Sequence, residues 1–90
     1  MRIEYLKIYS WMLQKFSKSS VAMVYALIYQ HYEASLECAM SYEELAEELN
    51  ITKMSTIRAV KELEQDGMIR VKRTFEKDGS NAINVYSIIQ

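Results

Sequence analysis

Residues 50–61, "NITKMSTIRAVK", decide the fold of this chain, because they contain a helix end, a helix start and a helix interior in one short run. Asn50 tolerates the left-handed backbone conformation that ends a helix. Thr52 is a residue type that caps the start of the next helix. Ala59 then falls at an inward position of that helix, which we expect to span residues 53–65.

The helix before this turn starts at "SYEE", where Ser41 and Glu44 have the spacing of a capping box. Glutamates in this first turn also suit the positive end of the helix dipole. We expect the helix to run to about residue 49. The stripe that it should bury consists of Tyr42, Leu45, Ala46 and Leu49.

An earlier helix is predicted over about residues 21–33, because apolar residues recur there at helical spacing. Ser19 or Ser20 can cap its start. The stripe that we expect to face the core consists of Val21, Val24, Tyr25, Ile28 and Tyr32. Residues 34–40 should form a connector to the next helix.

Two stretches after the helices alternate between apolar and polar residues, which indicates β-strands. They are "MIRVKRTF" (68–75) and "AINVYSII" (82–89), and a turn that contains Asp-Gly separates them. The apolar positions of these strands are Ile69, Val71 and Phe75, then Ile83, Val85 and Ile89. The fold class is therefore mainly α with a C-terminal β-hairpin.

Residues 3–16 are apolar nearly all round a predicted helix, although their Tyr and Ile residues also favour an edge strand for part of the segment. One apolar face can pack on the chain's own core, and the other can meet a second copy of the chain. The side chains expected at this dimer contact are Tyr5, Tyr9, Trp11, Met12 and Phe16. Purely internal packing is the alternative.

The composition predicts one folded domain, because the chain has 90 residues and 50% of them are hydrophobic. No apolar run is long enough to span a bilayer, and the charged N-terminus lacks the pattern of a signal peptide. Cys38 is the single cysteine and cannot form an internal disulfide. These features favour the cytoplasm and argue against a membrane partner.

The polar residues do not suggest a catalytic or metal site. His31 and Cys38 are two potential ligands without a third. The glutamates at 43, 44, 47 and 48 are typical of a solvated helix face, and the chain has no glycine-rich phosphate loop. We therefore expect no enzymatic activity, no metal and no cofactor.

The net charge of −1 argues against non-specific binding to polyanions, which depends on neutralising phosphates. The charge is segregated along the chain, however. Residues 19–50 carry six glutamates and no lysine or arginine. The basic side chains of residues 51–90 are Lys53, Arg58, Lys61, Arg70, Lys72, Arg73 and Lys77.

With Asn50 at the ninth position of a helix-turn-helix, Ala46 falls at the fifth, where a small residue lets two helices cross closely. The run "YEELAEELNITKMSTIRAVKELEQDGMI" fits that pattern without gaps, and the hairpin after it has the place and length of a wing. The chain resembles winged helix-turn-helix domains of small bacterial transcription regulators and of phage and plasmid replication proteins. The resemblance covers about residues 19–89 and implies a three-helix core (19–66) and a wing (68–89). Together with the N-terminal apolar segment (1–18), we expect one domain over residues 1–90.

The resemblance also implies a function: sequence-specific binding of double-stranded DNA, in transcription regulation or origin recognition, by a homodimer. The third helix would enter the major groove, with candidate contacts at Thr52, Lys53, Met54, Ser55, Ile57, Arg58 and Lys61. Arg58 fits a bidentate contact to guanine, and Lys61 fits a backbone contact. The wing would reach phosphates or a minor groove through Lys72, Arg73, Lys77, Ser80 and Asn81.

Each of these residues also has an ordinary structural interpretation. Lys61 is spaced to pair with Glu64 or Gln65, and Arg58 with Glu62, on the helix surface. Lys72 and Arg73 can protect an edge strand from aggregation.

Two positions depart from the usual pattern of such a helix. Thr56 stands where an aliphatic residue is usual, unless its hydroxyl bonds to the preceding turn. Met54 and Ile57 are expected to point outward, where they can contact thymine methyls or form a patch for a protein partner. A winged helix that binds protein is therefore the alternative function.

Overall fold

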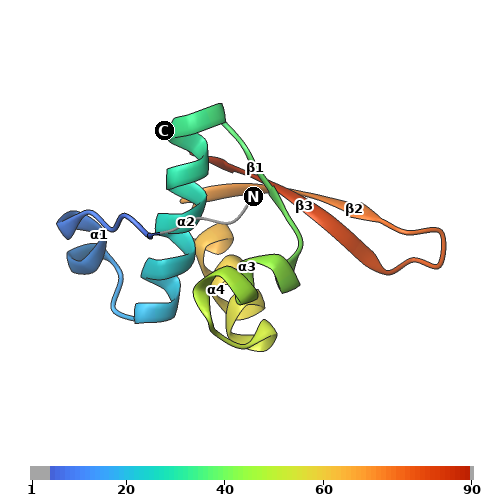
Figure 1. Ribbon diagram of the computed structural model, residues 1–90, viewed down its shortest axis with the longest axis horizontal. Helices are drawn as coiled ribbons and strands as arrows, with labels where there is room; N and C mark the ends of the chain where they lie inside the picture. The colour runs from blue at the N-terminus through green and yellow to red at the C-terminus, as the bar shows by residue number, and fades with distance from the viewer. Residues whose placement is uncertain (1–4, 90) are drawn as a thin grey trace.

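The computed structural model describes residues 5–89, which form four helices and three strands (Figure 1). In chain order they are α1 (Ser10–Lys15), α2 (Ser19–Ser35), β1 (Cys38–Met40), α3 (Tyr42–Leu49), α4 (Lys53–Gln65), β2 (Ile69–Phe75) and β3 (Asn81–Ile88). The strands form one antiparallel sheet in the order β1-β3-β2. The β2–β3 hairpin projects beyond the helices as a wing (Figure 1). This arrangement confirms the predicted fold class.

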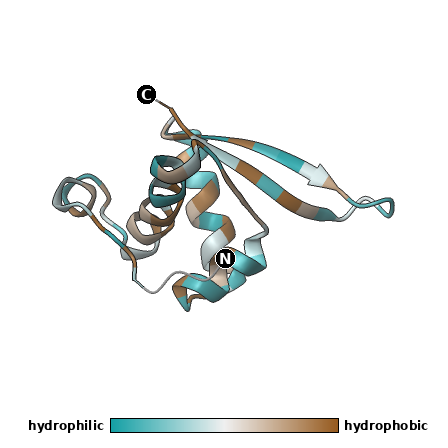
Figure 2. Cartoon of the chain, turned by 45° about the horizontal axis from the view of Figure 1, so that its top comes forward, coloured by the Kyte–Doolittle hydropathy of each residue, from teal (hydrophilic) through white to brown (hydrophobic). Residues whose placement is uncertain are grey.

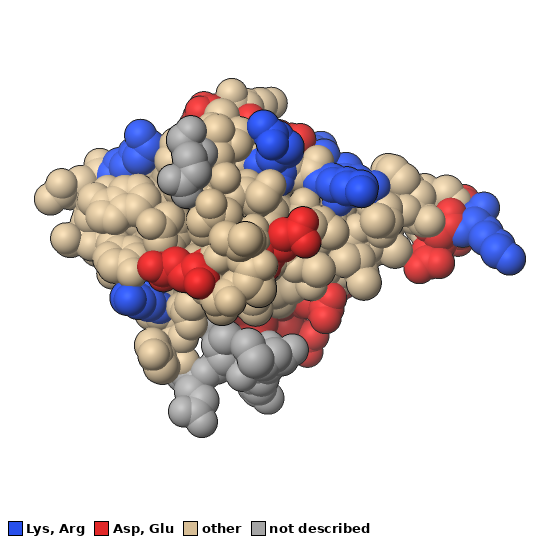
Figure 3. Space-filling view, turned by 90° about the horizontal axis from the view of Figure 1, so that it is seen from above, with Lys and Arg blue, Asp and Glu red and all other residues tan. Residues whose placement is uncertain are grey.

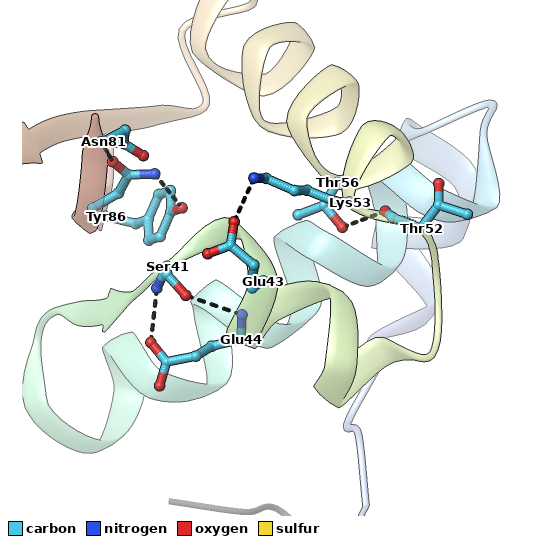
Figure 4. A network of polar contacts seen from close by, with 9 residues as sticks. Ser41, Glu43, Glu44, Thr52, Lys53, Thr56, Asn81 and Tyr86 are labelled. Carbon is cyan, nitrogen blue, oxygen red and sulfur yellow. Dashed lines mark hydrogen bonds and ion pairs between the residues drawn. The ribbon is translucent and has the colours of Figure 1, made fainter. Parts of the chain in front are cut away.

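Helix α3 begins with the predicted capping box. The Ser41 hydroxyl accepts a hydrogen bond from the Glu44 amide at 3.1 Å, and the Glu44 carboxylate accepts one from the Ser41 amide at 2.9 Å (Figure 4). The two bonds satisfy amides that the helix itself leaves without partners. They also fix where the chain turns from β1 into α3.

The turn between α3 and α4 has the predicted conformation. Asn50 lies in the left-handed region, with φ 55° and ψ 45°. The Thr52 hydroxyl then caps α4 by accepting from the Ser55 amide at 3.0 Å. Thr56 is fully buried, and its hydroxyl donates to the Thr52 carbonyl at 3.0 Å (Figure 4). A threonine is therefore accommodated at this core position because its one polar group has a partner.

The N-terminal segment differs from the predicted helix over residues 3–16. Residues 3 and 4 lie outside the described part, and α1 covers only Ser10–Lys15. Before it, the Gln30 side chain accepts from the Lys7 amide at 2.9 Å and donates to the Tyr5 carbonyl at 3.3 Å. These bonds use backbone groups that a helix would pair internally, and so they favour a non-helical chain over residues 5–9.

Strand β1 lies within the segment that was expected to be a connector. Leu36 ends α2 in the left-handed conformation with φ 71°. The chain then pairs with β3, with Cys38 opposite Tyr86 and Met40 opposite Asn84. A strand of three residues is too short to show a reliable alternation, and its pairing partner lies far along the chain.

The buried face of β3 is not the one that carries the alternating apolar positions Ile83, Val85 and Ile89 named from the sequence. Its buried residues are Asn84, Tyr86 and Ile88, whereas Ile83 is 45% exposed and Ile89 39%. The Asn84 side-chain amide donates to the Tyr86 hydroxyl at 2.9 Å, so both polar groups are satisfied inside the molecule.

The alternation places Phe75 on the same side of β2 as Ile69 and Val71, but in the structure Phe75 is 63% exposed whereas Ile69 is buried. A register shift between Arg73 and Phe75 turns the end of the strand. The mixed hydropathy of the two wing strands is visible in Figure 2.

Helix α2 supplies more buried apolar residues than any other described element, and it packs against α4, the sheet and α1. Its buried residues include Val21, Val24, Tyr25 and Ile28 of the predicted stripe, and Tyr32 is partly buried. The predicted inner residues of α3 and α4 are buried too: Tyr42, Leu45, Ala46, Leu49, Ala59 and Val60. No helix within residues 5–89 is long and apolar enough to cross a membrane.

Candidate nucleic-acid interface

The outward face of α4 is the centre of the candidate interface. Met54, Arg58, Lys61 and Gln65 are exposed and fall on one side of the helix, opposite buried Leu63 and its neighbours. Arg58 and Lys61 form no ion pair or side-chain hydrogen bond within residues 5–89, although the charge of Lys61 acts on Glu64, one of the partners considered for it, and lowers the pKa of that carboxyl. Both cations are free to meet a ligand.

Ile57 was expected on this outward face, but it is partly buried against the core. The apolar patch considered for a protein partner therefore narrows to Met54, which is 57% exposed. Thr52 and Ser55, two further candidates, are hydrogen-bonded to each other at the start of α4. Their hydroxyls fix the helix start, where the first amides of α4 also lie.

Lys53 is held by a carboxylate of the preceding helix. Its ammonium lies 2.6 Å from the Glu43 carboxylate, which reaches across from α3 (Figure 4). The hydrogen bond from Lys53 keeps the pKa of Glu43 below its usual range. Both side chains are 58% exposed, so a phosphate can compete for Lys53 at little cost.

Arg73 connects the base of the wing to α4. Its guanidinium donates to both oxygens of Glu64, at 2.8 and 3.1 Å. The guanidinium lowers the pKa of Glu64, and Glu64 raises that of Arg73. The two side chains are 29% and 36% exposed, so the pair is partly shielded from water. Its geometry gives Arg73 a partner within the chain, in contrast to the wing's other candidate cations.

Two polar candidates at the wing tip shape the hairpin. The Asp78 carboxylate accepts from the Ser80 amide at 2.9 Å and from its hydroxyl at 2.6 Å, and these bonds lower the pKa of Asp78. The Asn81 side chain donates to the Thr74 carbonyl and to Asn84.

Lys72 and Lys77 are exposed and have no ion-pair partner within residues 5–89. They are the wing's available cations.

A cleft of about 250 Å³ flanks α4 on the side of α2. Its polar lining comes from Lys18, Ser20, Ser55, Arg58 and Glu62. Lys18 pairs with Glu62 at 3.0 Å, so Glu62 binds this cation in place of Arg58. Lys18, Ser20 and Glu62 were not placed at the interface from the sequence, where Ser20 was considered only as a helix cap and Glu62 only as a partner of Arg58. A lysine directly before the two serines that begin α2 could have indicated an anion site. The Glu62 partner of this lysine, however, lies 44 residues away on α4, where sequence spacing does not reveal it.

Charged side chains of both signs are mixed over the molecular surface. Figure 3 shows acidic and basic groups side by side, and the projecting end of the wing also carries both. There is thus no broad surface of one sign in this view that would attract DNA from a distance. Particular side chains on α4 and the wing would have to supply the contacts.

The family model of the Crp-like helix-turn-helix domain matches residues 11–77, which extend from α1 to the wing tip. The chain belongs to this family. Its helix-turn-helix is formed by α3 and α4, and the β2–β3 hairpin is the wing. No curated protein matches the chain.

Solved structures with the same fold have low sequence identity to this Crp-like domain. One, the "N-terminal domain of DNA binding protein", has a TM-score of 0.63 and 18% identity, and the match covers 99% of this chain and 75% of that one. A protein from a "Rep-DNA complex" has a TM-score of 0.64 and 19% identity, with 97% and 75% covered. A "possible transcriptional regulator" from Methanosarcina mazei Go1 has a TM-score of 0.58 and 12% identity, with 87% and 66% covered. These likenesses support the winged helix-turn-helix fold.

Proposed function

We propose that this Crp-like domain binds double-stranded DNA sequence-specifically, with α4 in the major groove and the wing on the flanking backbone or minor groove. It would act in a transcription regulator or in a replication protein that recognises an origin. The solved relative in a Rep-DNA complex supports DNA as the class of ligand.

One observation carries the proposal. Several cations near α4 have a carboxylate partner within the chain: Lys18, Lys53 and Arg73. Arg58, on the outward face of α4, has none within the described residues and is exposed. Lys61, on the same face, is exposed and forms no ion pair within the described residues, although its charge acts on Glu64 and lowers the pKa of that carboxyl. An arginine there can donate two hydrogen bonds to guanine in the major groove, and Lys61 can contact a phosphate.

The test is Arg58→Ala, assayed on DNA selected by the wild-type domain from a random duplex library. We expect the variant to lose about 1–3 kcal/mol of discrimination at one base pair of the site, while its affinity for random DNA falls less. The assay is a binding titration against the selected site, single-base variants of it and random duplex. The matched control is Arg70→Ala, because Arg70 is an exposed arginine of β2 that lies off the outward face of α4.

The proposal fails if the wild-type domain enriches no sequence from the library and binds duplex DNA no better than the Arg58→Ala and Lys61→Ala variants. If Arg70→Ala causes the same loss as Arg58→Ala, charge rather than position explains the binding. A loss confined to Arg58→Ala at one base pair supports the assigned contact.

Met54 supports a second candidate function, binding of a protein through α4. Its side chain is 57% exposed near the start of that helix. In the DNA-binding interpretation, Met54 contacts a thymine methyl, and Met54→Ser then weakens binding only to sites with thymine at that position. Unchanged DNA discrimination in Met54→Ser, together with lost binding of a partner protein, would favour the alternative. The measurement compares the variant's site selection with that of the wild type.

We further propose that the chain forms a homodimer through its N-terminal segment. Tyr5, Trp11 and Leu13 are exposed there, although Trp11 also packs edge-on against Tyr25 and Tyr29. Met12, which was predicted at the dimer contact, is completely buried in the chain's own core and is therefore not available to a second copy. Two copies would place their α4 helices about 34 Å apart, in successive major grooves.

A further inference from the structure

The cleft between α2 and α4 combines donors from two helices in one small space. Lys18 and Ser20 come from the start of α2, and Ser55 and Arg58 come from the first half of α4. Val21 and Ala59, which also line it, are buried. The cleft therefore has a rigid floor formed by packed helices, with polar and charged side chains around it.

The chemistry of this lining suits a phosphate group. The Lys18 ammonium and the two serine hydroxyls can donate to the anionic oxygens of a phosphodiester. The guanidinium of Arg58, whose donors are assigned to a guanine, adds positive charge at the edge of the cleft. Helix α2 also begins without a side-chain cap, so the amides of its first turn lack a side-chain acceptor. The cleft flanks the outward face of α4, where a phosphate contact would set the position of that helix without reading a base.

Glu62 opposes binding of an anion in the same cleft. Its carboxylate lies 3.0 Å from the Lys18 ammonium, while Arg58, one turn earlier on α4, is not its partner. Lys18 is 67% exposed and Glu62 36%, so the pair is solvated and contributes little stability. A phosphate can therefore replace the carboxylate at Lys18.

We propose that the cleft binds one phosphodiester of the DNA backbone. In the free protein the Glu62 carboxylate pairs with the Lys18 ammonium, and the phosphate displaces this carboxylate when DNA binds. The inference rests on the proposed DNA binding, and it adds Lys18 and Ser20, at the start of α2, to the contacts expected from the recognition helix and the wing. Glu62 acts as an internal competitor, because its release from Lys18 is part of each binding event. It lowers affinity for every sequence alike, so discrimination between sequences depends only on the base contacts made by α4.

The test is Glu62→Gln, measured as DNA affinity over a salt series. We expect affinity for selected and random duplex to rise by about two- to fivefold, the range of one exposed ion pair. The plot of log affinity against log salt should steepen by less than about 0.9, because in the wild type the displaced Glu62 carboxylate takes up a cation from solution and so offsets part of the counterions released from the DNA. The charge control is Glu37→Gln, since Glu37 is exposed beyond the other end of α2.

A change of Lys18 distinguishes two ways in which Glu62 could weaken DNA binding: by pairing with Lys18, or by repelling the phosphate directly. In the Lys18→Gln background, adding Glu62→Gln should no longer raise affinity or steepen the slope, because the freed cation is absent. Equal melting temperatures of the variants would show that each is folded.

The outcomes separate this inference from the proposed function. If the wild type selects a DNA site but Glu62→Gln behaves like Glu37→Gln, the cleft inference is wrong and DNA binding stands. An equal gain from Glu62→Gln with and without Lys18 would also overturn it. If no duplex is bound specifically by the wild type, the proposed function and the cleft fail together.

Discussion

At the scale of single residues, Glu64 and Arg73 show how one ion pair can orient the wing. The two hydrogen bonds, 2.8 and 3.1 Å long, hold the plane of the guanidinium against the carboxylate. Glu64 lies in the last turn of α4, and Arg73 lies in β2. The pair therefore links the angle of the wing to the helix that is proposed to enter the groove. Arg73, predicted as a DNA contact, becomes a candidate positioning residue.

The pair predicts a pH-dependent stability. Because Arg73 lowers the pKa of Glu64 in the folded chain, the stabilisation is present above the unfolded pKa of about 4.3 and is lost as the pH falls through the folded value. Glu64→Gln should lower the free energy of unfolding by about 1 kcal/mol at pH 7, since the pair is partly exposed. Urea denaturation of both proteins at pH 7 and pH 3 measures this.

From pH 7 to pH 3 the difference between Glu64→Gln and the wild type should shrink, because the stabilisation is lost as the pH falls through the lowered pKa of Glu64. Glu47→Gln serves as control, as Glu47 is exposed on α3 and forms no ion pair within residues 5–89. A loss of equal size at both pH values would show that packing, and not charge, explains the effect of Glu64→Gln.

At the scale of elements, the helix-turn-helix was predictable because its signals are local. Ser41 and Glu44 lie three residues apart, and Asn50 and Thr52 act on their own backbone or on the next turn. Each signal favours the same boundary as the apolar spacing around it. The bounds of α3 and α4 therefore follow from the sequence alone.

The sheet was less predictable because its strands depend on distant partners. β1 exists through its pairing with β3, where Cys38 lies opposite Tyr86. The inner face of β3 includes Asn84, which would be expected outside until its bond to Tyr86 is known. Alternation of apolar residues alone therefore does not identify the buried face of β3.

The candidate interface shows the same division between local and distant information. Helical spacing correctly placed Met54, Arg58 and Lys61 on the exposed side of α4. It did not indicate which cations have partners within the chain, because those partners lie on other elements. Lys18 and Glu62, for instance, are 44 residues apart.

At the scale of the whole molecule, the apolar N-terminal segment and the wing lie on opposite sides of α2 (Figure 1). A second copy that packs on α1 would therefore leave the wing accessible. The rings of Tyr9, Trp11, Tyr25 and Tyr29 pack together beneath this surface. They give α1, a helix of six residues, a firm base on α2.

Leu13 tests the proposed dimer, because it is 61% exposed on α1 and can be changed without disturbing the core. Leu13→Glu should convert the dimer to a monomer, since two carboxylates would enter one apolar contact. Light scattering after size exclusion, over a range of concentrations, measures the mass. Gln14→Glu adds the same charge at the neighbouring exposed residue and should remain dimeric. If the wild type is monomeric at every concentration, or if Leu13→Glu remains dimeric, this dimer contact is excluded. Two copies would then need another interface to place their α4 helices in successive major grooves.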